Sequence, residues 1–168
     1  MKKEMGKISI KKVRFDAEEV FKSGKFLCAE AVLCSIAQNI AFDMPKEFAA
    51  AASGFSIGVG GSQCMCSCIS AAVMSLGYFF GRDFPTTPTD PQSQKTLILA
   101  HELQASFKNK NKVLCCHIHN KGKNMEAGEH LDHCALLVGD AAAMAAEIIA
   151  RELGFLIVDG GAYDEKRG

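Results

Sequence analysis

The sequence predicts an all-α fold: a helical bundle of about five to six helices with a glycine-rich corner and a cysteine-lined pocket. Apolar residues recur at helical spacing through long, alanine-rich segments. Capping residues, prolines and glycines mark where these segments start and stop. At 168 residues the chain is long enough to bury a core without disulfides, so we expect one domain over residues 1–168.

The first segments predict two helices. A short helix is expected over residues 16–21, with Phe15, Val20 and Phe21 turned inward. A serine and a glycine then stop it. Residues 27–42 are alanine-rich and place their apolar side chains on one helical face, which predicts a longer helix.

A proline and a glycine-rich segment organise the next part of the chain. Pro45 suits the first turn of a third helix that ends at Gly54. Residues 54–62 lack the lysine of a phosphate-binding loop, so we interpret them as a corner where the backbone packs tightly. Ser62 is then the expected N-cap of a helix that runs through Tyr78.

The next helix has a clear start signal. Asp90 followed by Pro91 predicts a helix from Gln92 to about Phe107. Residues 113–129 show no clean period and are expected to form loops.

The last long helix is expected to begin at a cap, Asp132, and to end at Gly154. Residues 155–158 then form either a short strand or an apolar tail. The richest apolar stretch, residues 135–149, is interrupted by two acidic residues, so we predict no membrane span.

Charge and targeting signals exclude some functions. Lysine plus arginine equals aspartate plus glutamate, at 19 each, so no basic field favours nucleic acid. The charged N-terminus is not followed by the apolar run of a signal peptide, and we expect a cytoplasmic protein.

Eight cysteines in a protein expected inside the cell indicate metal binding or redox chemistry rather than structural disulfides. No Cys-x-x-Cys occurs, which disfavours a thioredoxin-type dithiol, a zinc knuckle and covalent haem attachment. A site must therefore be assembled from distant segments.

Predicted helix starts deliver several of these sulfurs. Cys28, Cys64, Cys66 and Cys134 all lie within about two turns of an expected helix start. Free N–H groups there favour a thiolate or a metal-bound sulfur. Cys34, in the middle of a helix, is interpreted as core packing.

A mixed cysteine and histidine site is a second option, with zinc as its metal. An exposed polar loop explains the same residues equally well. The residues concerned are Cys115, Cys116, His117, His119, His130 and His133.

With these residues in view, the chain resembles the redox-active protein family named for its C_GCAxxG_C_C pattern. Residues 28–33 resemble the family's first cysteine segment, and residues 54–61 its glycine-rich stretch. Cys66 begins the central motif, in which Ser67, Cys68 and Ala71 replace glycine, alanine and glycine. The pattern spans residues 15–153.

The resemblance implies a redox role and a set of ligands. The third family cysteine corresponds to Cys115 or Cys116, with Cys115 fitting slightly better, and the fourth to Cys134. A similar domain in split-Soret cytochromes c is associated with an iron–sulfur cluster. The implied ligands are Cys28, Cys66, Cys115 and Cys134, and the secondary candidates are Cys64, Cys68, Cys116, His117 and His119.

The leading hypothesis is therefore an iron–sulfur protein, with [2Fe–2S] favoured, that acts in electron transfer or redox sensing. It would need a redox partner protein, and a homodimer is left open. One alternative is a thiol–disulfide oxidoreductase in which Cys66 attacks and Cys134 or Cys68 resolves. The other is a zinc-binding Cys/His protein.

Overall fold

The computed structural model describes residues 6–159 and confirms the all-α class. One two-stranded sheet joins the ends of this region. The elements in chain order are β1 (Lys7–Ile8), α1 (Ile10–Lys22), α2 (Cys28–Asn39), α3 (Lys46–Ala50), the 3-10 turn η1 (Ser53–Phe55), α4 (Ser56–Val59), α5 (Ser67–Phe80), α6 (Pro91–Asn111), α7 (Cys116–His119), α8 (Leu131–Leu153) and β2 (Leu156–Ile157).

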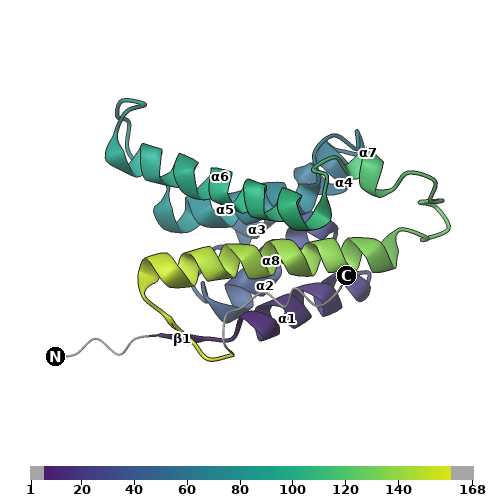
Figure 1. The fold of residues 1–168 in the computed structure, drawn as a ribbon, viewed down its shortest axis with the longest axis horizontal. Coiled ribbons are helices and arrows are strands. Elements are labelled where there is room, and N and C mark those ends of the chain that lie inside the picture. Colours follow the sequence, from purple (N-terminus) through teal and green to yellow (C-terminus); the bar gives the residue numbers. More distant parts are fainter. Residues whose placement is uncertain (1–5, 160–168) are drawn as a thin grey trace.

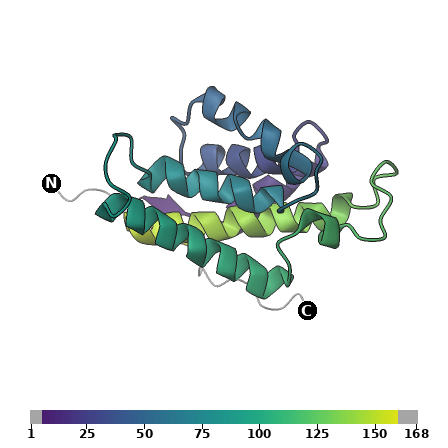
Figure 2. The same cartoon turned by 90° about the horizontal axis from the view of Figure 1, so that it is seen from above.

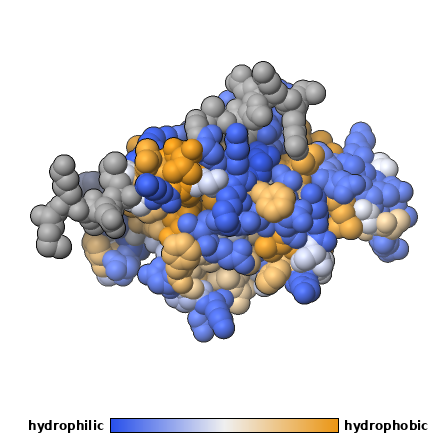
Figure 3. All heavy atoms as spheres, turned by 90° about the horizontal axis from the view of Figure 1, so that it is seen from below, coloured by the Kyte–Doolittle hydropathy of each residue, from blue (hydrophilic) through white to orange (hydrophobic). Residues whose placement is uncertain are grey.

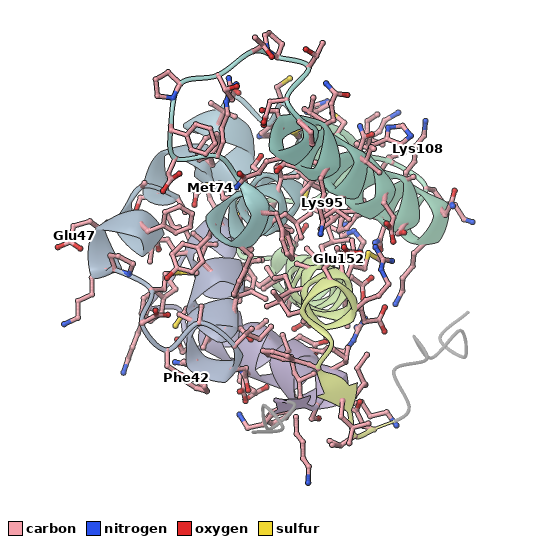
Figure 4. The ribbon with its side chains drawn as sticks, turned by 90° about the vertical axis from the view of Figure 1, so that its left-hand side faces the viewer. Phe42, Glu47, Met74, Lys95, Lys108 and Glu152 are labelled. Carbon is pink, nitrogen blue, oxygen red and sulfur yellow. The ribbon has the colours of Figure 1, made fainter. Side chains whose placement is uncertain are left out.

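Helix α8 is the central element of the bundle. It packs against α1, α2, α5 and α6, and the end-on view shows it between the purple α1 and α2 and the teal α5 and α6 (Figure 4). Figures 1 and 2 show α6 running alongside it. Small alanine side chains at residues 141–143 and 145–146 let neighbouring helices approach closely, and these residues are buried.

By length and composition alone, α8 could cross a membrane, and it is the one such helix among the described residues. However, 83% of its most apolar window is buried inside the fold. Core helices of other bundles share this property. The two acidic residues that interrupt it in the sequence, Asp140 and Glu147, are buried and half-buried among its neighbours.

Ion pairs tie the outer helices to α8. Asp140 is buried and pairs with Arg14 of α1 and with Lys110 of α6, whose Nζ lies 2.9 Å from its carboxylate. Near the other end of α8, Lys95 lies 2.9 Å from Glu152, and Figure 4 shows the two residues together. The bundle is therefore held across α8 by charge as well as by apolar packing.

The chain segment after α8 is a strand rather than a loose tail. Leu156 and Ile157 of β2 pair in parallel with Lys7 and Ile8 of β1. Asp159 then accepts hydrogen bonds of 2.7 Å from the Ser9 hydroxyl and from the Lys11 backbone N–H. The end of the described chain thus closes onto the start of α1.

The prediction for the first helix was too short, and one of its core residues was wrong. Helix α1 begins at Ile10, because the Ser9 hydroxyl caps it by accepting the Lys12 N–H at 3.0 Å. Phe15 is 62% exposed, since the buried face of α1 runs through Val13, Ala17 and Phe21. On the face shown in Figure 3, hydrophobic residues form separate patches among hydrophilic ones.

Several other helix starts also differ from prediction. Helix α5 begins at Ser67 with Cys66 as its N-cap, and not after Ser62. Helix α8 begins before Asp132, which lies in its first turn. The short helix α7 forms where we predicted only loops. Asp90 is the N-cap of α6 as predicted, accepting the Ser93 N–H at 2.9 Å, and that helix continues to Asn111.

Candidate functional site: a cysteine cluster at the helix starts

Cysteines from the starts of four helices converge at one end of the bundle. Cys28 is the first residue of α2, Cys66 is the N-cap of α5, and Cys116 is the first residue of α7. Cys134 lies in the first turn of α8. Figure 1 shows α4, α7 and the start of α8 at the same end. Charges on Cys28 and Cys66 raise the pKa of both Cys116 and Cys134, so the four sulfurs form one electrostatic group.

An apolar cavity of about 180 Å³ lies in front of these sulfurs. Cys28, Cys116 and Cys134 line it, while Cys66 and Cys68 are buried behind it. Burial raises the pKa of Cys116 to about 11 and that of Cys134 to about 12. Both are therefore neutral thiols at pH 7. Its apolar walls come from Phe21, Phe26, Leu27, Ile57, Met125 and Leu131.

Cys28 is the thiolate of the group. A hydrogen bond from the Cys68 thiol lowers the pKa of Cys28 to about 6, which outweighs the opposing effect of burial. The backbone N–H groups of Ile57 and Ala29 donate to the same sulfur and lower its pKa further. In the protein without metal, Cys28 is mostly ionised at neutral pH.

Cys68 is the proton donor of the group. Hydrogen bonds to Cys28 and Cys66, together with burial, raise the pKa of Cys68 well above its ordinary value. The same interaction lowers the pKa of Cys66. A thiol has one proton, so Cys28 and Cys66 share this donor. Cys68 therefore supports its neighbours as a thiol.

The backbone in front of α5 forms a left-handed turn that faces Cys28. Ile57, Gly58, Val59 and Gly60 all have φ between 55° and 62°. This conformation is strained for β-branched residues such as Ile57 and Val59. The Ser67 hydroxyl fastens the turn by accepting the Gly58 N–H at 2.8 Å and donating to the Phe55 carbonyl at 2.5 Å. The turn aims the Ile57 N–H at the Cys28 sulfur.

The glycine-rich corner allows close backbone approach, as the sequence indicated. A Cβ on Gly58 would lie 2.6 Å from the backbone of Gln63. The left-handed turn also explains why α5 cannot begin at Ser62, because the chain between Gln63 and Met65 still has residues at positive φ. Right-handed helix starts only after Cys66.

Of the adjacent pair, the structure places Cys116 on the cavity and Cys115 away from it. The Cys115 sulfur lies 3.7 Å from the carbonyl oxygen of Gln63. Cys115 is the N-cap of α7, with extended backbone, and Cys116 is the first helical residue. The two side chains therefore leave the chain in different directions. The assignment of Cys115 as a ligand remains a prediction, but the geometry favours Cys116.

The candidate histidines have other partners. His119 lies 3.1 Å from the Val113 carbonyl, which can only accept, so its Nε2 carries the proton. Its Nδ1 then accepts from Nε2 of His133 at 3.4 Å. Burial lowers the pKa of both imidazoles. His117 is exposed and contacts the Gln63 side chain at 3.3 Å. None of the three belongs to the described lining of the cavity.

Two further cysteines lie apart from the cluster. Cys34 is half-buried on α2, and its sulfur lies 3.4 Å from the Gln38 side-chain amide. Burial raises the pKa of Cys34, helped by the charge of Asp16. Cys64 is exposed in the loop before α5. Neither lines the cavity as the described residues define it.

Asn120 is a site residue that the sequence analysis missed. It is buried, lines the cavity, and lies within hydrogen-bond distance of both Cys116 and Cys134. Its position four residues after Cys116 would have indicated contact only if α7 had been predicted as a helix. Since no period was visible there, no sequence signal pointed to it.

The donors around the cavity were compared with the groups expected to bind. Within residues 6–159, no three His, Cys, Asp or Glu side chains are grouped so that they could hold one metal ion. A zinc site needs four donors about a single ion, whereas a [2Fe–2S] cluster divides four thiolates between two irons. Cys28, Cys66, Cys116 and Cys134 match the cluster's ligands in kind and number. The donor set thus fits a two-iron cluster better than a zinc ion.

Comparison with known proteins agrees with a redox role. No curated protein and no solved structure matches the chain. The sequence profile of the family described as "Putative redox-active protein (C_GCAxxG_C_C)" matches residues 26–148, a span that contains every cysteine of the cluster. This match covers well over half of the chain, which therefore belongs to that family of redox-active proteins.

Proposed function

We propose that this redox protein holds an iron–sulfur cluster, [2Fe–2S], through Cys28, Cys66, Cys116 and Cys134, and uses it in electron transfer or redox sensing. The observation that carries the proposal is the convergence of these sulfurs from four helix starts on one cavity. Thiol–disulfide exchange needs only two sulfurs. Four from separate segments match the ligand count of a cluster.

The residues around the sulfurs have definite roles in this proposal. When bound, such a cluster accepts and releases single electrons. The N–H groups of Ile57 and Ala29 donate to the Cys28 sulfur and stabilise its negative charge. Cys68 remains protonated as a donor behind the ligands. The apolar walls exclude water, which strengthens these electrostatic interactions.

Exposed apolar residues beside the cavity support a redox partner protein. Phe26, Leu27 and Leu131 line the cavity and are between 43% and 48% exposed. A partner that packs on them would bring its own redox centre near the four sulfurs. The identity of that partner and a homodimeric state both remain predictions.

The test is the metal and sulfide content of protein purified without oxygen. We expect a coloured protein with visible absorption and about two irons and two acid-labile sulfides per chain. Cys28→Ser should lose this content, whereas Cys34→Ala should retain it, because Cys34 lies outside the cluster. Wild-type protein without iron and sulfide would refute the proposal, and zinc in their place would support the zinc alternative.

A second candidate, thiol–disulfide exchange, is favoured by the lowered pKa of Cys28, about 6. The sequence suggested Cys66 as the attacking residue, but Cys66 is only 5% exposed while Cys28 lines the cavity. The Cys28 thiolate would attack a substrate disulfide and expel one thiolate, forming a mixed disulfide. Cys68 would lose its proton, attack the Cys28 sulfur and expel the second thiolate. The substrate gains two electrons and the protein keeps a Cys28–Cys68 disulfide.

Mass spectrometry separates this candidate from the cluster. Metal-free protein incubated with a small disulfide such as oxidised glutathione should lose two hydrogens and contain a Cys28–Cys68 linkage. Cys68→Ala should stop at the mixed disulfide on Cys28. If wild-type protein also stops at the mixed disulfide, Cys68 does not resolve it and this candidate fails.

A further inference from the structure

We propose that Asn120 is a positioning residue that assigns opposite hydrogen-bonding roles to Cys116 and Cys134. Asn120 is 5% exposed and lies on the wall of the cavity. Its amide nitrogen is 3.5 Å from the Cys116 sulfur, and its amide oxygen is 3.6 Å from the Cys134 sulfur. One side chain thus contacts sulfurs from two helices, α7 and α8.

The backbone fixes which way this amide faces. The Asn120 Nδ2 atom lies 3.0 Å from the carbonyl oxygen of Cys116. A carbonyl oxygen only accepts hydrogen bonds, so the atom facing it must be the NH2 group. The oxygen of the amide consequently faces Cys134, and its lone pairs require a donor there. The Cys134 S–H is that donor.

The two sulfurs therefore differ although they share a partner. The NH2 group uses one hydrogen for the Cys116 carbonyl and the other for the Cys116 sulfur, which favours a thiolate at Cys116. The amide oxygen favours a protonated thiol at Cys134. All three hydrogen-bonding groups of this buried side chain are satisfied, as expected for a residue that fixes geometry.

This inference deepens the proposed function, since it rests on Cys116 and Cys134 belonging to the redox centre. An N–H hydrogen bond to a ligating sulfur withdraws charge and raises the reduction potential of a cluster. Replacing Asn120 with Asp keeps the size of the side chain but removes the N–H donor. In the iron-loaded protein we expect Asn120→Asp to lower the midpoint potential.

The decisive experiment uses reduced, metal-free protein, so its outcome does not depend on whether iron binds. The rates at which iodoacetamide alkylates Cys116 and Cys134 are measured separately by mass spectrometry at pH 7. A Cys115→Ser background removes the neighbouring thiol. The variants are Asn120→Asp and Asn120→Leu, with exposed Asn109→Asp and Asn109→Leu on α6 as controls.

The two variants have different expected signatures. Asn120→Leu removes both hydrogen bonds, so Cys116 should react about tenfold more slowly and Cys134 faster. Asn120→Asp removes the donor but keeps an acceptor, so both cysteines should react more slowly. The control variants should leave both rates unchanged.

A purely structural role for Asn120 would loosen the packing, and both cysteines would react faster in both variants. That result, or unchanged rates, would overturn the inference. If Asn120→Asp does not fold by circular dichroism, the opposite changes expected for Asn120→Leu decide the question alone. Wild-type protein without iron, combined with these opposite changes, would refute the cluster and leave the role of Asn120 standing.

Discussion

The backbone N–H of Ile57 donates to the sulfur of Cys28, and Ile57 adopts a left-handed conformation in order to do so. Its φ of 55° is rare for a β-branched residue. Strain of this kind persists only where surrounding contacts impose it, and it concentrates at functional sites. Here the strained turn and the lowered pKa of Cys28 are two aspects of one arrangement.

Relieving the strain should stabilise the protein. Ile57→Gly keeps the N–H group and suits the left-handed backbone, so the free energy of unfolding should rise by about 1 kcal/mol. Ile98→Gly is the matched control, because Ile98 is 65% exposed on the right-handed helix α6. That change should destabilise by about 1 kcal/mol. Urea denaturation of both variants measures the difference, and a loss of stability in Ile57→Gly would contradict the strain.

Gly58 should tolerate no side chain. Both Gly58 and Gly60 have φ of 62°, but only Gly58 lies against another backbone segment, 2.6 Å from the Gln63 backbone after addition of a Cβ. Gly58→Ala should therefore cost about 2 kcal/mol more than Gly60→Ala in the same urea experiment. Equal costs would show that the turn moves freely away from Gln63.

Cys28 should titrate in the metal-free protein with a pKa of about 6. The pH profile of its alkylation measures this value. Cys68→Ala removes the largest contribution and should move the midpoint upward, toward the ordinary value of 9.0. A wild-type midpoint near 9.0 would contradict the hydrogen-bonded thiolate.

The same shift links stability to pH. The unfolded thiol, with its ordinary pKa of 9.0, binds more protons between pH 6 and 9 than folded Cys28 does. The free energy of unfolding should therefore gain a contribution as pH rises from 6 to 9, and lose it as pH falls through 6. The contribution should shrink in Cys68→Ala, as measured by urea denaturation across this range.

The buried carboxylate of Asp140 should be essential for stability. Asp140→Ala leaves Arg14 and Lys110 without this partner inside the bundle and should cost about 3 kcal/mol. Glu102→Ala breaks the Arg151 pair, whose side chains are 52% and 40% exposed, and should cost less than about 1 kcal/mol. Thermal unfolding of the two variants compares them, and equal costs would contradict the buried character of the Asp140 pairs.

The sequence predicted the fold class well because alanine-rich helical periods and cap residues are local signals. Asp90 is one example, since its carboxylate accepts the Ser93 N–H as expected. Phe15 shows the limit, because the early start of α1 depends on Ser9 and turns the helix so that Phe15 faces solvent. Ser62 shows another, since left-handed residues without glycine give no sequence signal.

The candidate site was only partly visible in the sequence. Helix starts pointed to Cys28, Cys66 and Cys134, which the structure brings together. The choice between Cys115 and Cys116 depends on where α7 begins, and four residues are too few for a period to appear. Asn120 and the proton donor Cys68 emerge only from tertiary contacts.

Iron and acid-labile sulfide in the variants Cys115→Ser and Cys116→Ser, purified without oxygen, test the central claim most directly. The two changes are chemically identical and affect neighbouring residues. The account predicts that Cys116→Ser loses the cluster with an intact fold, because its sulfur lines the cavity, and that Cys115→Ser retains it. Loss of the cluster in Cys115→Ser and full retention in Cys116→Ser would contradict the assignment of the site.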